Sequence, residues 1–172
     1  MSAPIDEILL RFSYDIGLYG LMNSRNVWPV VESLHFFGLC LLIGSVGIFD
    51  LRMLGIGRGI SFAALHKLIP FGLVGYGINA ITGFMFVLAA PGQYLYNPAF
   101  QTKLLFMLCA GINMLTYYAT VNQRLKQTPD FDKAMVRAKI IAIISLVCWM
   151  GVISCGRLIT FFRPPYHWCF WC

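Results

Sequence analysis

The segment from Trp28 to Phe49 is an apolar run long enough to cross a lipid bilayer. It reads WPVVESLHFFGLCLLIGSVGIF and carries one carboxylate, Glu32, and one imidazole, His35. An ionisable group at membrane depth is costly and usually has a function. Glu32, His35 and Gly38 recur at helical spacing, so we expect them to share one face of a helix. This face is the first candidate for a functional site.

The composition places the whole chain among membrane proteins. Of its 172 residues, 59% are hydrophobic and only 12% are charged, whereas soluble domains carry roughly a quarter charged residues. The mean hydropathy is +0.72. The net charge of +6 comes from basic residues that flank apolar segments, where they act as topology signals and contact membrane lipid headgroups. We therefore exclude nucleic acid as a partner and expect one membrane domain over residues 1–172.

The predicted fold class is an all-α membrane protein, a four-transmembrane-helix bundle with an N-terminal amphipathic interfacial helix. The amphipathic helix is expected over residues 4–20, because its apolar side chains fall on one stripe away from its charges. The spanning helices are expected at about 28–49, 68–90, 99–120 and 140–162, each close to the roughly 20 residues that a bilayer requires. Residues 163–172 form a tail.

The basic residues predict the orientation. Of the 13 Lys and Arg, three lie in the loop 52–67 and five in the loop 121–139. Positive loops stay in the cytoplasm. The sequence therefore predicts a multi-pass protein of the bacterial inner (cytoplasmic) membrane with both termini and the tail in the periplasm. Asp50 and Arg52 are expected to close the first spanning helix as a surface pair or to bind headgroups.

With this topology, four ionisable groups from three helices fall in one outer layer. At 1.5 Å per residue, Glu32 and Lys103 lie about 6 Å from the outer end, Arg157 about 8 Å and His35 about 10 Å. Polar residues in a membrane bundle face inward. We therefore expect inward stripes with the following members: His35, Gly38 and Leu42; Asn79, Thr82, Gly83 and Phe86; Lys103, Met107, Ala110, Met114 and Tyr117 with Asn113 beside them; Met150, Ser154 and Arg157.

Two interpretations of this layer stay open. In the first, His35 is the metal ligand, as an axial ligand of haem b, with Gly38 leaving room for the macrocycle. Lys103 or Met107 would be its second ligand, and Arg157, Lys103 or Arg163 would pair with the propionates. In the second, Glu32 pairs with Lys103 or Arg157 and only fixes helix packing. His66 lies at the opposite end, about 20 Å or more from His35, and cannot share its iron.

Two stretches carry a family resemblance. ESLHFFGLCLLIGSVGIFDLRMLG and FQTKLLFMLCAGIN resemble small bacterial four-helix membrane proteins that include HemJ-type protoporphyrinogen oxidases, copper-resistance D-like proteins and uncharacterised families, one of which looks closest. The resemblance implies a haem b role for a first-helix histidine, here His35, and a ligand or substrate role for Lys103. The chain differs in Asn113, which stands where a histidine is expected, in Glu32 and in its cysteine-bearing tail.

We therefore expect a protein that binds one haem b near the periplasmic side and acts in electron transfer or a membrane-linked redox step, with quinone or a redox partner protein. The alternative is a non-catalytic membrane subunit or a homo-oligomeric scaffold whose polar layer only fixes helix packing. A transporter is less favoured, because no pair of broken helices is evident. In the tail, Cys169 and Cys172 form a CxxC that is compatible with a disulfide, a metal contact or neither.

Overall fold

The computed structural model describes residues 4–57, 59–121 and 135–162, and within these ranges every regular element is a helix. Four of the helices are long and apolar enough to cross a membrane. They are α3 (Val27–Met53), α5 (Ile69–Ala89), α7 (Pro98–Thr120) and α9 (Met135–Leu158). The predicted all-α membrane fold with four spanning helices is confirmed. The predicted tail, with its two cysteines and Arg163, lies outside the described residues.

The helix ends differ from the predicted ones where charged residues were assigned to loops. Helix α3 continues to Met53, and the backbone turns only at Gly55 and Gly57, whose φ angles are +95° and +70°. The short helix α4 (Phe62–His66) then precedes α5. Helix α9 begins at Met135 and continues as the 3-10 turn η1 (Ile159–Phe162). The predicted first loop therefore begins too early, and Asp50 and Arg52 belong to a spanning helix.

The N-terminal helix expected over residues 4–20 is two helices, α1 (Ile5–Asp15) and α2 (Leu18–Met22). They are separated by Gly17, whose φ of +74° lies in the left-handed region that ends a helix. Ile5, Ile8 and Phe12 of α1 are exposed, as expected for a helix lying in the membrane interface. On its other side the Asp6 carboxylate accepts a hydrogen bond from Tyr96, which raises the pKa of this phenol.

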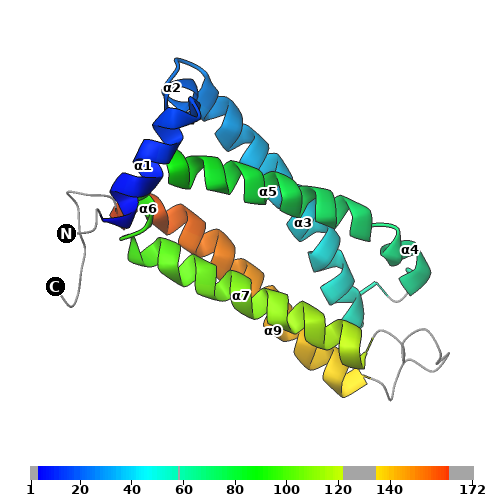
Figure 1. Cartoon of the computed structure of the whole chain (residues 1–172). Coiled ribbons are helices and arrows are strands. Elements are labelled where there is room, and N and C mark those ends of the chain that lie inside the picture. Colours follow the sequence, from blue (N-terminus) through cyan, green and yellow to red (C-terminus); the bar gives the residue numbers. More distant parts are fainter. Residues whose placement is uncertain (1–3, 58, 122–134, 163–172) are drawn as a thin grey trace.

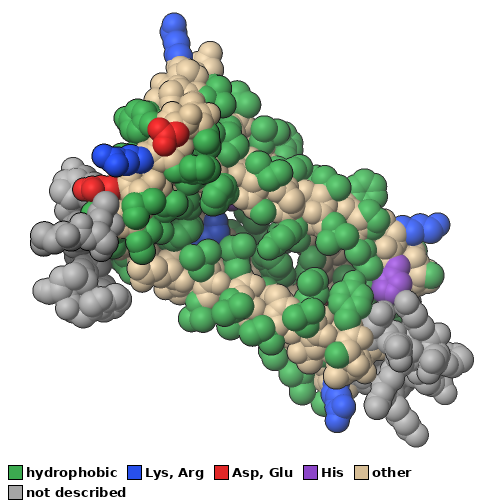
Figure 2. Space-filling model, in the orientation of Figure 1, with side chains coloured by type: hydrophobic (Ala, Val, Ile, Leu, Met, Phe, Trp, Pro, Cys, Tyr) green, Lys and Arg blue, Asp and Glu red, His purple; other side chains and the backbone are tan. Residues whose placement is uncertain are grey.

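The spanning helices form two antiparallel hairpins (Figure 1). Helix α3 packs along α5, and α7 packs along α9, while the main link between the hairpins is the contact of α3 with α9. We call the end of the bundle near α1 and α2 the α1 end, and the end near α4 the α4 end. Figure 2 shows apolar side chains over most of one face and charged side chains gathered mainly near the two ends. Such a surface suits contact with lipid.

Each end has its own group of buried apolar side chains. The α1 end is packed around Met22, Val31, Phe86, Ala89, Tyr94, Ala99 and Ile159. The α4 end is packed around Met53, Tyr117, Val121, Ala138, Ile141 and Ala142. Asn97 links the start of α7 to η1 near the α1 end, because its Oδ1 caps α7 at Ala99 N and its Nδ2 donates to the carbonyl of Ile159 over 2.9 Å. The interior between these two groups holds the polar residues considered next.

Candidate functional site

His35 lies on the side of α3 that faces α5. Its Nδ1 is 2.7 Å from the hydroxyl oxygen of Thr82, and its ring packs edge-on against Phe86 with centroids 5.7 Å apart. The imidazole lies beside Gly83, where a Cβ would stand in ordinary contact with its Cε1, 3.7 Å away. The predicted inward stripes of the first two spanning helices are confirmed here, since Thr82 and Phe86 are buried and His35 is half-buried.

The hydrogen bonds of Thr82 set the protonation pattern of His35. The Thr82 hydroxyl donates its single proton to the carbonyl of Ile78, 2.6 Å away. Its oxygen must therefore accept from His35, so Nδ1 carries the imidazole proton. In a neutral imidazole the other nitrogen, Nε2, then carries no proton and has a free lone pair. No described residue donates a hydrogen bond to Nε2, so this nitrogen is available to a ligand or a metal.

Lys103 and Met107 lie on α7, on the face that turns toward the interior. Both are half-buried, and the amine of Lys103 lies beside Gly156 of α9, 3.8 Å from where a Cβ would stand. Lys103 is close enough to His35 for their charges to interact. The structure therefore brings together the histidine and the lysine of the predicted layer.

Glu32 and Arg157 do not join them. Both are exposed, and within the described part of the chain neither forms an ion pair with the other or with Lys103. The expectation that Glu32 shares the His35 face is wrong. Residues three apart are displaced by about 60° around the helix axis, so Glu32 lies about 120° away from Gly38, which is buried. Val31, Gly38 and Leu42 occupy the buried face instead.

The predicted stripe of α9 lies on the wrong side of that helix. Met150, Ser154 and Arg157 do share a face, but the face is exposed. Arg157 lies over the ring of Phe161, 5.9 Å from its centroid. The buried face of α9 consists of Ala138, Ile141, Ala142, Ser145, Cys148, Val152 and Cys155, and Ile159 of η1 continues it. A helical repeat identifies residues that share a face, but not which face is buried.

Two further predicted residues hold helices together. Gly38 is where α3 meets α5: a Cβ there would lie 3.0 Å from the carbonyl oxygen of Gly75, and one on Gly75 would lie 2.6 Å from that of Gly38. The space that a side chain at Gly38 would occupy is filled by α5, so this glycine leaves no room for a macrocycle. Asn113 is buried and donates to the Ile141 carbonyl over 2.9 Å, joining α7 to α9.

A cavity of about 370 Å³ lies toward the α4 end, between the two hairpins. It is lined mainly by apolar and aromatic side chains of α3, α5, α7 and α9, with Leu65 of α4. Figure 2 shows that the face between α5 and α7 is hollowed, and these two helices are not packed along one another. Met107 lines both this cavity and the side of α7 that carries Lys103.

Asp50 is the residue of this cavity that the sequence reasoning missed. It is only 3% exposed and Arg52 only 8%, so the expected surface pair is wrong. The Arg52 side chain instead donates from Nε to the Ile60 carbonyl and lies over the ring of Phe62, 4.7 Å from its centroid. The Ser145 hydroxyl lies next to the Asp50 carboxylate, but the Oδ2 atom of Asp50 has no hydrogen-bond partner. A longer first spanning helix would have revealed Asp50 as an intramembrane acid.

The comparisons with known proteins give one family match, which covers both the region around His35 and the cavity with Asp50. A model described as a family of unknown function, DUF6644, matches residues 17–162. The chain belongs to this family. No curated protein and no solved structure matches it. The matched range runs from α2 to η1 and includes His35, Lys103 and Asp50. The resemblance to HemJ-type oxidases and copper-resistance D-like proteins stays a prediction.

Proposed function

We propose that the protein binds one haem b at the α1 half of the bundle, with His35 as an axial ligand, and acts in electron transfer or another membrane-linked redox step. The observation that carries this proposal is the hydrogen bond from His35 to Thr82. It leaves the Nε2 lone pair free, and iron-ligating histidines are typically oriented by a bond of this kind on their other nitrogen.

The donor set near His35 suits haem better than a metal held by side chains alone. Within the described residues no three His, Cys, Asp or Glu side chains gather in a group that could hold a metal ion. A haem iron is already bound by its macrocycle and takes only one or two protein ligands. His35 would supply the first, and Lys103 or Met107 is the candidate for the second. When bound, haem b supplies one-electron chemistry at its iron.

The remaining predicted residues have more modest roles in this proposal. Thr82 orients the imidazole and Phe86 packs against it. Arg157 is exposed at the α1 end, where its guanidinium could pair with a propionate that reaches the membrane surface. Quinone or a redox protein would be the electron partner. Glu32 points away from the site and would act only through its charge.

The visible spectrum of the protein in mild detergent tests the proposal. We expect a Soret band in the wild-type protein, made with an ample haem supply. The band should be lost in His35→Ala and kept in His66→Ala, which removes the other described imidazole. A colourless wild-type protein, or a band that survives in a folded His35→Ala variant, would overturn haem ligation by His35.

A structural role is the alternative, and the inter-helix hydrogen bonds favour it. His35 joins α3 to α5, and the amides of Asn97 and Asn113 join α7 to η1 and α9. In a non-catalytic subunit or a homo-oligomer these bonds would only hold the helices in register. His35→Ala would then lower the unfolding temperature of a protein that shows no Soret band before or after the change.

We further propose that the α1 end faces the periplasm of a bacterial cell. The described basic residues Arg137 and Lys139 lie at the α4 end, as the rule for cytoplasmic positive charge requires. A cysteine introduced at Ser24 should react with a membrane-impermeant reagent in intact cells, after Cys169 and Cys172 are removed. A cysteine at Gly59 should react only after lysis. The reverse pattern would refute this orientation.

A further inference from the structure

We propose that the cavity at the α4 half is a binding site for a lipophilic ammonium cation, with Asp50 as its counter-ion. This site is separate from His35 and does not depend on haem. The inference combines a buried carboxylate with no ion-pair partner among the described residues and one oxygen without a hydrogen bond, a wall of aromatic side chains and an opening toward lipid.

The carboxylate of Asp50 is the charge that the site presents. Asp50 lies at the cavity wall, 3% exposed, and Oδ2 accepts no hydrogen bond. It forms no ion pair with any described residue, since Arg52 points to Ile60 and Phe62. A charge buried without a partner is strongly disfavoured in an apolar interior. A ligand that brings a positive charge removes this cost.

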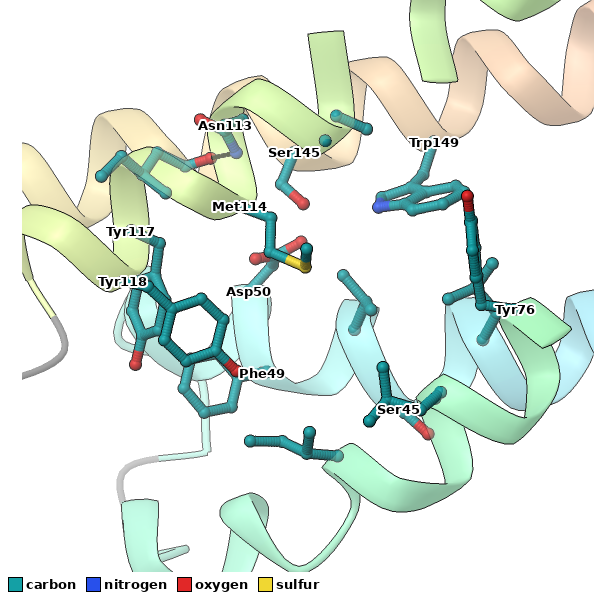
Figure 3. A pocket seen from close by; sticks show the side chains of 18 of the residues that line it. Ser45, Phe49, Asp50, Tyr76, Asn113, Met114, Tyr117, Tyr118, Ser145 and Trp149 are labelled. Carbon is teal, nitrogen blue, oxygen red and sulfur yellow. Dashed lines mark hydrogen bonds between the residues drawn. The ribbon is translucent and has the colours of Figure 1, made fainter. Parts of the chain in front are cut away.

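Aromatic rings surround the space in front of this carboxylate (Figure 3). The Asp50 carboxylate and the Ser145 hydroxyl point into the same region, with Trp149 and Tyr76 on one side and Phe49 on the other. Tyr117 packs edge-on against Phe49, with centroids 5.4 Å apart. Aromatic faces attract ammonium groups, most strongly where water is excluded. Rings together with a single carboxylate therefore favour a quaternary or alkylated ammonium head.

Two other polar side chains of the lining already donate hydrogen bonds within the protein. Ser45 donates to the Leu41 carbonyl, and Asn113 donates to the Ile141 carbonyl. Among the lining residues Asp50 is the one carboxylate, and the other polar groups are neutral amides, hydroxyls and an indole. A metal ion would need several oxygen ligands, and within the described residues no such group is present. The remaining lining is apolar and suits a hydrocarbon body.

The size and position of the cavity fit a ligand that arrives from the bilayer. About 370 Å³ lies within the range of small-molecule pockets. The cavity is bordered by all four spanning helices, and the face between α5 and α7 is hollowed (Figure 2). A lipophilic cation can partition into the membrane and enter between these two helices.

The test uses the full-length protein in nanodiscs of zwitterionic phosphatidylcholine. The probes are phenylpropyltrimethylammonium and its uncharged analogue, in which a tert-butyl group replaces the trimethylammonium. Equilibrium dialysis measures binding, with empty nanodiscs subtracted. We expect saturable binding of the cation to the wild-type protein, weaker by about tenfold or more in Asp50→Asn, because the buried charge pair is lost while the aromatic rings remain. Glu32→Gln removes an exposed carboxylate from the same helix and should bind as the wild type does.

A second variant keeps the proposal testable if Asp50→Asn does not fold. Gly111 lines the cavity from α7, and a Cβ there meets no atom within 4 Å. Gly111→Leu should fill the cavity and weaken cation binding to a similar degree while Asp50 stays in place. Equal binding of the cation to wild type and to either variant would overturn the proposal. So would equal binding of the cation and the uncharged analogue, because the site would then recognise shape or a neutral lipid-phase molecule rather than charge.

Discussion

His35 and Asp50 belong to the same spanning helix, but their surroundings differ in kind. His35 faces a neighbouring helix that approaches closely enough for Gly38 and Gly75 to touch, and the Thr82 hydroxyl of that helix accepts a hydrogen bond from Nδ1 of His35. Asp50 faces a hollow between the two hairpins, and one of its oxygens has no partner. Where the helices meet backbone to backbone, the protein orients the polar side chain, and Nδ1 of His35 is bonded while Nε2 stays open. Where the helices stand apart, the Oδ2 atom of Asp50 has no partner within the protein.

The largest effect is expected where the helices touch. A Cβ on Gly75 would lie 2.6 Å from the Gly38 carbonyl oxygen and 2.7 Å from the Leu42 nitrogen. These are backbone atoms and cannot move away without separating the helices. Gly75→Leu should therefore destabilise the protein by about 2 kcal/mol or more, measured by unfolding in mixed detergent micelles. Gly77→Ala on the same helix meets nothing within 4 Å and should leave stability nearly unchanged. An unaltered Gly75→Leu protein would remove the contrast.

A smaller effect is expected at the bond that satisfies His35. Thr82→Val keeps the shape of the side chain but leaves the Nδ1 proton of His35 without its acceptor. We expect a loss of about 1–2 kcal/mol in unfolding free energy. We also expect a shifted or weakened Soret band if haem is bound, since the imidazole loses its orientation. Thr116→Val removes only a bond to the carbonyl of its own helix and serves as the control. Equal behaviour of the two variants would argue that Thr82 does not position His35.

The smallest effect on stability is expected in the hollow. Gly111→Leu places a large side chain where no atom lies within 4 Å of the new Cβ, and leucine favours a helix more than glycine does by up to about 1 kcal/mol. Its unfolding free energy should stay within about 1 kcal/mol of the wild-type value, in the same assay as Gly75→Leu. A loss as large as that of Gly75→Leu would mean that the hairpins pack closely here and that the cavity is filled in solution.

The predictions from the sequence succeeded where one helix alone decides the outcome. The four spanning helices follow from length and apolar content, and helical spacing alone puts His35, Gly38 and Leu42 on one face of α3. The predictions failed where a second helix decides. Arg157 lies on the exposed side of α9, and Gly38 contacts Gly75 rather than a cofactor.

The sequence by itself determined the membrane class, because an apolar segment of bilayer length has few other stable environments. It also identified His35 as a polar residue that needs a partner. Only the tertiary structure decided that Thr82 is this partner and that Asp50 has none for its Oδ2. The physical reason is that a periodic pattern places residues around their own helix axis, whereas a partner or a cavity depends on how closely a second helix approaches.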